Sequence, residues 1–150
     1  MSSIEKNINQ FSQRYNFEKR NYNIIIHSPD ATGKYDFIIE ILKNYYESRG
    51  IKNFDNIDLC PDIFYLSLPL YDKSGKQERV LNNYERLLFE FGLEEKFDNS
   101  RIGSDISIEQ IRQLKEFTNL SPTYAHKFVI INNCNYLNNQ SSAALLKTLE

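Results

Sequence analysis

Four consecutive apolar residues, Phe128–Ile131, constrain the fold of this chain more than any other segment. A short strand that is apolar on both faces is typical of a parallel sheet buried beneath helices. Helical periodicity precedes this run between Ile108 and Phe117, and strong helix formers follow it at Ala143–Leu149. The pattern predicts an α/β fold in which helices and strands alternate and the crossovers are right-handed.

Other predicted elements come from apolar spacing along the chain. Two strands are expected at Tyr22–His27 and Asp62–Leu70, where β-branched and aromatic residues cluster. The expected helices begin with an amphipathic segment from Ile4 to Tyr15, followed by Tyr35–Ser48 and a segment from Val80 to Phe91. We expect a loop at Asp98–Asp105.

Local signals predict several helix ends. Ser107 and Gln110 fit a capping box at the start of one helix, and Pro122 ends that helix at Leu120–Pro122. Gly50 is expected to end the helix before it. Asn138 or Asn139 is expected to cap the last helix.

Bulk properties limit the class of protein. With 150 residues and 41% hydrophobic residues, the chain suits about one domain with a sizeable core. A net charge of −2 excludes a basic coat for nucleic acid, and no apolar run approaches the roughly 20 residues of a membrane span. Met1–Asn9 is polar and does not suit a signal peptide. Cys60 and Cys134 make no disulfide framework, so a cytoplasmic location is expected.

Four segments in the second half of the chain carry a family resemblance. They read I-E-Q-I-R-Q-L at Ile108–Leu114, L-S-P at Leu120–Pro122, K-F-V-I-I-N-N at Lys127–Asn133 and S-S-A-A-L-L-K-T-L-E at Ser141–Glu150. In this order they resemble the delta prime subunits of bacterial DNA polymerase III, a clamp-loader AAA+ family.

The likeness is weaker at Tyr22–Lys34 and Pro61–Leu70, and the insert Tyr71–Asp105 has no recognisable counterpart. The resemblance implies an incomplete P-loop AAA+ domain with a mainly parallel sheet. It implies that residues 1–150 are the N-terminal part of that domain, without its later strands and without lid and collar domains. Because the strand that follows in such a sheet is missing, we expect Ile24–Ile26 and Phe128–Ile131 each to lack a hydrogen-bonding neighbour on one side. We also expect the isolated chain to be marginally stable or partly molten.

A degenerate phosphate loop is expected at Ser28–Tyr35. A working loop reads G-x-x-x-x-G-K-[ST], and here only Gly33 and Lys34 match. Ser28 replaces the first glycine and Tyr35 replaces the hydroxyl residue that ligates Mg²⁺. Lys34 and a helix N-terminus could still attract a phosphate, so weak ATP binding remains open.

A degenerate acidic motif follows the buried strand. In P-loop ATPases this strand ends in Asp-Glu, whereas here Asn132 and Asn133 stand in those positions. Amides do not carry the charge that a hard cation prefers, and they cannot act as a general base. We therefore expect no catalytic residue and no cofactor in this chain, although it resembles a subunit of the DNA-directed DNA polymerase III complex, a nucleotidyltransferase.

Many family members carry a four-cysteine zinc module before a His-Pro-Asp sequence. Here Cys60-Pro61-Asp62 matches the Pro-Asp, and one thiolate does not hold a structural zinc, so no metal is expected. His27, His126 and Cys134 share no ligand spacing.

The resemblance implies a non-catalytic subunit that helps to load the sliding clamp in DNA replication. Its partners would be the tau/gamma and delta subunits, with indirect contact to the clamp and primed DNA. The arginine finger of the family lies beyond the last helix and is assigned to no residue here. Two alternatives remain: a decayed gene fragment without independent function, and an atypical P-loop nucleotide-binding protein.

Overall fold

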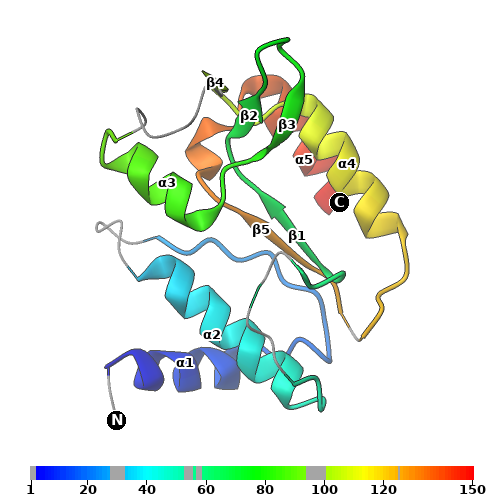
Figure 1. Cartoon of the computed structure of the whole chain (residues 1–150). Helices are drawn as coiled ribbons and strands as arrows, with labels where there is room; N and C mark the ends of the chain where they lie inside the picture. The colour runs from blue at the N-terminus through cyan, green and yellow to red at the C-terminus, as the bar shows by residue number, and fades with distance from the viewer. Residues whose placement is uncertain (1–2, 28–32, 53–55, 57–58, 94–100, 125) are drawn as a thin grey trace. The chain divides into compact units, whose positions relative to one another are not determined.

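The computed structural model describes residues 3–27, 33–52, 56, 59–93, 101–124 and 126–150 (Figure 1). The chain divides into two compact units, Met1–Cys60 and Pro61–Glu150, and each is described by itself. Among the described residues, no helix has the length and apolar character needed to cross a bilayer.

The N-terminal unit is a pair of helices, α1 (Ser3–Arg14) and α2 (Lys34–Glu47), held together by aromatic side chains. The ring of Phe11 lies 4.6 Å from Tyr15 and 5.6 Å from Phe37 of α2, measured between centroids. Phe17 packs edge-on against Tyr45 at 5.9 Å. Both helices confirm the sequence prediction. The buried apolar residues of this unit are Ile8, Ile41, Leu42, Tyr45 and Tyr46.

Polar contacts fix the ends of these helices. Gly50 has a φ of +76° and its N–H donates to the carbonyl of Glu47, which confirms the predicted helix end. Arg49 donates to Glu18 at 2.6 Å. The hydroxyl of Tyr22 accepts a hydrogen bond from Arg20, and this bond lowers the pKa of Tyr22.

The predicted strand at Tyr22–His27 does not form. Side chains in this segment alternate between half-buried and exposed, and Ile25 is 88% exposed. A strand requires a hydrogen-bonded neighbour, and the described residues of the N-terminal unit contain no strand. β-branched composition alone therefore does not secure a strand in this segment.

In the C-terminal unit, β1 (Ile63–Leu66) and β5 (Phe128–Ile131) form a parallel pair, with Ile63 opposite Phe128 and Leu66 opposite Ile131. Figure 1 shows the two strands side by side. The parallel pairing confirms the α/β prediction. Val129 is 38% exposed, so β5 is less completely covered than its composition predicts.

Two helices, α4 (Ile108–Asn119) and α5 (Asn139–Leu149), pack together beside this pair. Their shared core is apolar, and burial of each large side chain stabilises the fold by about 1.5–3 kcal/mol. The fully buried residues of this core are Leu66, Ile106, Ile111 and Leu114.

The helix ends agree with the local signals. Ser107 and Gln110 form the predicted capping box, and α4 ends with Leu120 as its C-cap. Lys127 donates its Nζ to the carbonyl of Phe117 and stacks over that ring. Asn138, one of the two predicted caps of α5, accepts from the N–H of Ser141.

A second, antiparallel sheet was not predicted. It contains β2 (Pro69–Tyr71), β3 (Gln77–Val80) and β4 (Arg101–Ile102), in the order β3-β2-β4. The predicted single strand Asp62–Leu70 is therefore two strands in two sheets, because the chain leaves the parallel pair after Leu66. The apolar residues of the segment Asp62–Leu70 belong to two separate cores. The second core is formed by Leu68, Leu70 and Leu81.

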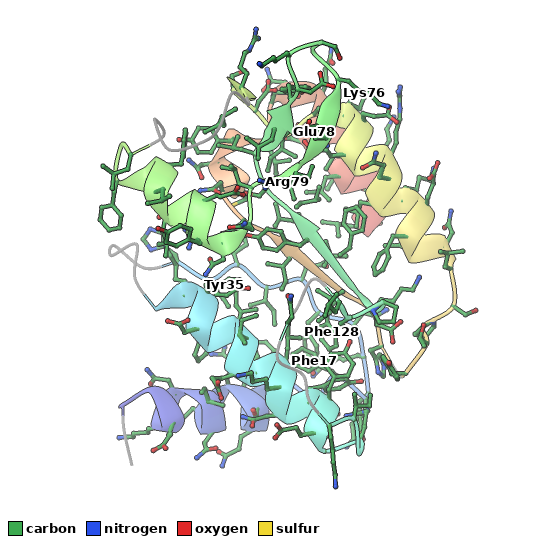
Figure 2. The ribbon with its side chains drawn as sticks, in the orientation of Figure 1. Phe17, Tyr35, Lys76, Glu78, Arg79 and Phe128 are labelled. Carbon is green, nitrogen blue, oxygen red and sulfur yellow. The ribbon has the colours of Figure 1, made fainter. Side chains whose placement is uncertain are left out.

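The β2–β3 hairpin is closed by Asp72, whose Oδ1 accepts from Ser74 and from the N–H of Lys76 at 2.9 Å. The hydrogen bond from Ser74 lowers the pKa of Asp72. Gly75 has a φ of +82° at this turn, a conformation that glycine adopts without strain. Figure 2 labels Lys76, Glu78 and Arg79 on this hairpin.

The helix of the insert, α3, spans Asn83–Glu90 and is shorter than the predicted segment from Val80 to Phe91. Val80 belongs to β3 instead, and Asn82 and Glu85 form a capping box that starts the helix after it. The predicted loop Asp98–Asp105 is wrong at Arg101–Ile102, which form β4 because they pair with β2. Residues 98–100 of that loop lie outside the described residues.

Candidate functional site

Of the predicted phosphate loop Ser28–Tyr35, the structure describes residues 33–35, which lie at the start of α2. Gly33 is the N-cap, with a φ of +87°, and the N–H of Phe37 donates to its carbonyl at 3.0 Å. Apart from its chain neighbours, no described residue has an atom within 4 Å of a Cβ built on Gly33, so its positive φ is the feature that favours glycine here. Ser28 lies outside the described residues.

Lys34 and Tyr35 are the first two residues of α2, and both side chains are half-buried. Figure 2 shows Tyr35 at this helix start. A helix N-terminus and a lysine attract anions. In the predicted loop Tyr35 stands where a Mg²⁺-binding hydroxyl is expected, and Asp36 adds an acid to the first turn. The structure thus places Lys34 and Tyr35 together at the N-terminus of α2, and the interpretation of this segment as a degenerate phosphate loop stays a prediction.

Asn132 directly follows β5 and continues its pairing. Its N–H donates to the carbonyl of Leu66 at 2.8 Å. Its side-chain amide donates to the hydroxyl of Tyr65 on β1. The first position of the degenerate acidic motif thus ties the carboxyl ends of the two parallel strands together.

Asn133 has a φ of +56°, a left-handed conformation that asparagine tolerates better than most residues. Its Oδ1 accepts from the hydroxyl of Ser67 at 3.3 Å, and its Nδ2 donates to Oε1 of Glu90 at 3.2 Å. The same Glu90 oxygen accepts from Arg86 at 2.5 Å. Both polar atoms of the Asn133 side chain are therefore used within the protein.

These contacts bear on whether the carboxyl ends of the two parallel strands could bind a metal ion. A hard cation prefers charged oxygen ligands, and both positions of the motif carry neutral amides that already have protein partners. Within the ranges that the structure describes, no group of three or more His, Cys, Asp or Glu side chains could hold a metal ion.

The protein-family model described as DNA polymerase III, delta subunit, matches residues 4–150. The chain belongs to this family. It is therefore a DNA polymerase III clamp-loader-related subunit, and its mixed α/β architecture agrees with part of an AAA+ domain. No curated protein and no solved structure matches the chain significantly.

The predicted site residues of this delta-family chain fall in both units. Gly33, Lys34 and Tyr35 belong to the N-terminal unit, whereas Asn132 and Asn133 belong to the C-terminal unit.

Sequence reasoning missed the partners of the two asparagines, which are Tyr65, Ser67 and Glu90. None of these three contacts has a local signal in the sequence, but the ion pair that holds Glu90 does. Arg86 and Glu90 have the i, i+4 spacing of an ion pair on a helix.

The Pro-Asp shared with the family has a structural role in this chain. The buried Asp62 carboxylate, 1% exposed, accepts from the backbone N–H groups of Thr123 and Tyr124, both at 2.7 Å. These bonds tie the segment after Leu120–Pro122 to the start of β1. Cys60, beside this motif, is half-buried, and Cys134 is exposed.

Proposed function

We propose that this delta-family chain is a non-catalytic clamp-loader subunit of the delta prime type. The observation that carries the proposal is the amide pair Asn132–Asn133 at the end of β5, where a hydrolysing subunit would need acids. Both amides donate hydrogen bonds to protein groups, Asn132 to Tyr65 and Asn133 to Glu90. Phosphoryl transfer depends on charge stabilisation at that position, so the chain contributes structure rather than chemistry.

Tyr35 supports the same conclusion from the other motif. A phenol on a rigid ring does not replace the short hydroxyl that binds Mg²⁺ beside the phosphate-loop lysine. Two independent losses, at Tyr35 and at Asn132–Asn133, agree with a subunit that assists a hydrolysing neighbour. We propose the tau/gamma and delta subunits as its partners, acting together on the sliding clamp at primed DNA in the cytoplasm.

Helix α5 supplies a surface for such a partner. Leu146 and Leu149 are three residues apart on this helix and are 59% and 51% exposed. Exposed leucines at helical spacing suit a protein contact, because their burial in a complex removes apolar area from water.

The test is assembly with the tau/gamma and delta subunits of the same organism, followed by size exclusion. We expect the 150-residue chain to co-elute with them. Leu146→Ser combined with Leu149→Ser should reduce co-elution and leave the melting temperature unchanged. Leu120→Ser, at a residue that is 67% exposed, is the matched control and should co-elute normally. Absence of co-elution would contradict the proposal, and a non-cooperative melt of the same chain would then favour a decayed fragment.

One observation favours the second candidate, an atypical nucleotide-binding protein. Gly33 keeps a left-handed conformation at the N-cap of α2, directly before Lys34. Calorimetric titration with ATP tests it, with and without Mg²⁺. This candidate requires binding that weakens in Lys34→Ala, whereas the leading proposal requires no hydrolysis in either protein.

A further inference from the structure

We infer that the inserted helix α3 is fastened to the former catalytic edge of the sheet by Glu90, and that this contact requires an amide at position 133. The contact joins residues 43 positions apart in the sequence. It goes beyond the proposed function, because it assigns the asparagine a role that loss of catalysis alone does not give.

Hydrogen-bond chemistry fixes the orientation of the Asn133 amide. A glutamate carboxylate only accepts hydrogen bonds, so the group that faces Glu90 at 3.2 Å has to be the NH₂. Oδ1 then faces Ser67, whose hydroxyl donates to it at 3.3 Å. In this orientation the asparagine amide satisfies both neighbours at once, with its donor toward Glu90 and its acceptor toward Ser67.

The carboxylate of Glu90 is held in place from the helix side. Arg86 is buried and donates to the same oxygen at 2.5 Å, and it also donates to Asn83 at 3.3 Å. Arg86 Nε has no partner among the described residues, so the ion pair with Glu90 supplies most of the compensation for burying this charge. Oε1 of Glu90 is therefore held between Arg86 on its own helix and Asn133 at the end of β5.

The inner face of α3 adds apolar contacts to this polar one. Phe89 packs on the core of Leu68, Leu70 and Leu81, and its ring lies 6.0 Å from that of Tyr136. Tyr136 follows Asn133 in the 3₁₀ helix, and its N–H donates to the Asn133 carbonyl at 2.8 Å. The side chain of Asn133 contacts α3 directly, and the turn that begins at Asn133 places Tyr136 against Phe89.

An acid at position 133 would break this arrangement. Aspartate would still accept from Ser67, but it would lose the donor and place a second negative charge beside Glu90. An acid at position 133 would therefore weaken the attachment of α3 to the end of β5.

The test is a double-mutant cycle on the 150-residue chain with Asn133→Asp and Glu90→Gln. Aspartate also tolerates a positive φ, so the first change leaves the backbone unstrained. We expect hydrogen exchange of the α3 amides to become about tenfold faster in Asn133→Asp. Adding Glu90→Gln should slow this exchange again in part, because the glutamine amide supplies a new donor to the aspartate. Asn135→Asp adds the same charge at an exposed neighbour and should leave α3 unchanged.

Two results would overturn the inference. One is equal α3 exchange in Asn133→Asp and Asn135→Asp. The other is additivity of Asn133→Asp and Glu90→Gln in urea unfolding. If Asn133→Asp fails to fold, recovery of folding in the double variant supports the contact, and failure of both variants counts against it.

Discussion

Arg79 and Glu85 form a two-pronged ion pair that joins β3 to α3, with both nitrogen–oxygen distances at 2.5 Å. The same carboxylate accepts from the N–H of Asn82 at 3.0 Å, as the reciprocal half of the capping box. Hydrogen bonding to Arg79 lowers the pKa of Glu85 and raises that of Arg79. One side chain therefore sets both where α3 begins and how it attaches to the hairpin.

Replacing Glu85 with glutamine tests this pair. Glutamine preserves the capping box and removes the charge, so we expect a loss of about 0.5–1 kcal/mol of stability at pH 7. Urea unfolding measures it. The matched control is Glu78→Gln, which removes a charge beside Arg79 and should change stability by less. Equal effects of the two changes would contradict the assignment.

The same pair makes a pH prediction with a definite sign. The pKa of Glu85 lies below its ordinary value of 4.5 in the folded chain. A carboxyl of this kind stabilises the fold above its unfolded pKa, and the stabilisation is lost as the pH falls through the folded pKa. We expect the stability difference between the original chain and Glu85→Gln to be constant at neutral pH and to shrink below 4.5. A difference that grows on acidification would refute this.

Replacing Asp62 is expected to lower stability more than replacing Glu85. Its carboxylate is buried and accepts two backbone N–H groups at 2.7 Å, and Asp62→Asn would turn one acceptor into a donor facing an N–H. We expect a loss of about 1–3 kcal/mol in chemical unfolding. Glu116→Gln, an exposed charge loss on α4, should lie within about 0.5 kcal/mol of the original chain. Similar losses would show that net charge, rather than the two hydrogen bonds, matters.

Leu114 tests the core of the C-terminal unit. It is 1% exposed and packs with Leu66, Ile106 and Ile111, so Leu114→Ala should cost about 2–5 kcal/mol through lost transfer energy and the cavity left behind. The exposed Leu120 is the matched control, and Leu120→Ala should change stability by about 0.5 kcal/mol or less. Thermal melts followed by circular dichroism distinguish the two.

Gly103 tests the unpredicted antiparallel sheet. A Cβ at this residue would lie 2.6 Å from Cγ of Pro69 and 2.9 Å from the ring of Tyr71. We expect Gly103→Ala to destabilise the sheet by about 1–3 kcal/mol and to speed exchange of the Gly103 N–H, which donates to the Pro69 carbonyl at 2.8 Å. Ser104→Ala, at the exposed neighbour, should have little effect. An unchanged exchange rate in Gly103→Ala would argue against the close packing of this strand.

The parts of the fold that were predictable from sequence depend on local physics. The capping box of Ser107 and Gln110 involves residues three positions apart, and the character of Phe128–Ile131 follows from its composition. The antiparallel sheet was missed because β2 and β4 are joined by long-range pairing, Leu70 with Ile102, which no local period reports. Tyr22–His27 failed for the opposite reason, since propensity was present and a strand partner was not.

The candidate site shows the same division. Asn132 and Asn133 could be located because they directly follow an apolar strand. Their partners Tyr65 and Ser67 lie 67 and 66 residues away in the sequence, so no spacing rule could assign them. The sequence therefore predicts that this motif lacks the acids of a hydrolysing site, and the structure shows which contacts the two asparagines make.

The pairing of Tyr71 with Arg101 has a further consequence for the history of this chain. The two residues are direct neighbours across β2 and β4, so the chain departs from and returns to nearly the same point around residues 72–100. A segment whose ends adjoin can be gained by an ancestral protein as a graft, without displacing the surrounding scaffold. Once Leu81 and Glu90 of such a graft bind the older core and Asn133, however, its removal would expose apolar surface and leave Asn133 without its acceptor. An addition that began as dispensable would thereby become part of the fold.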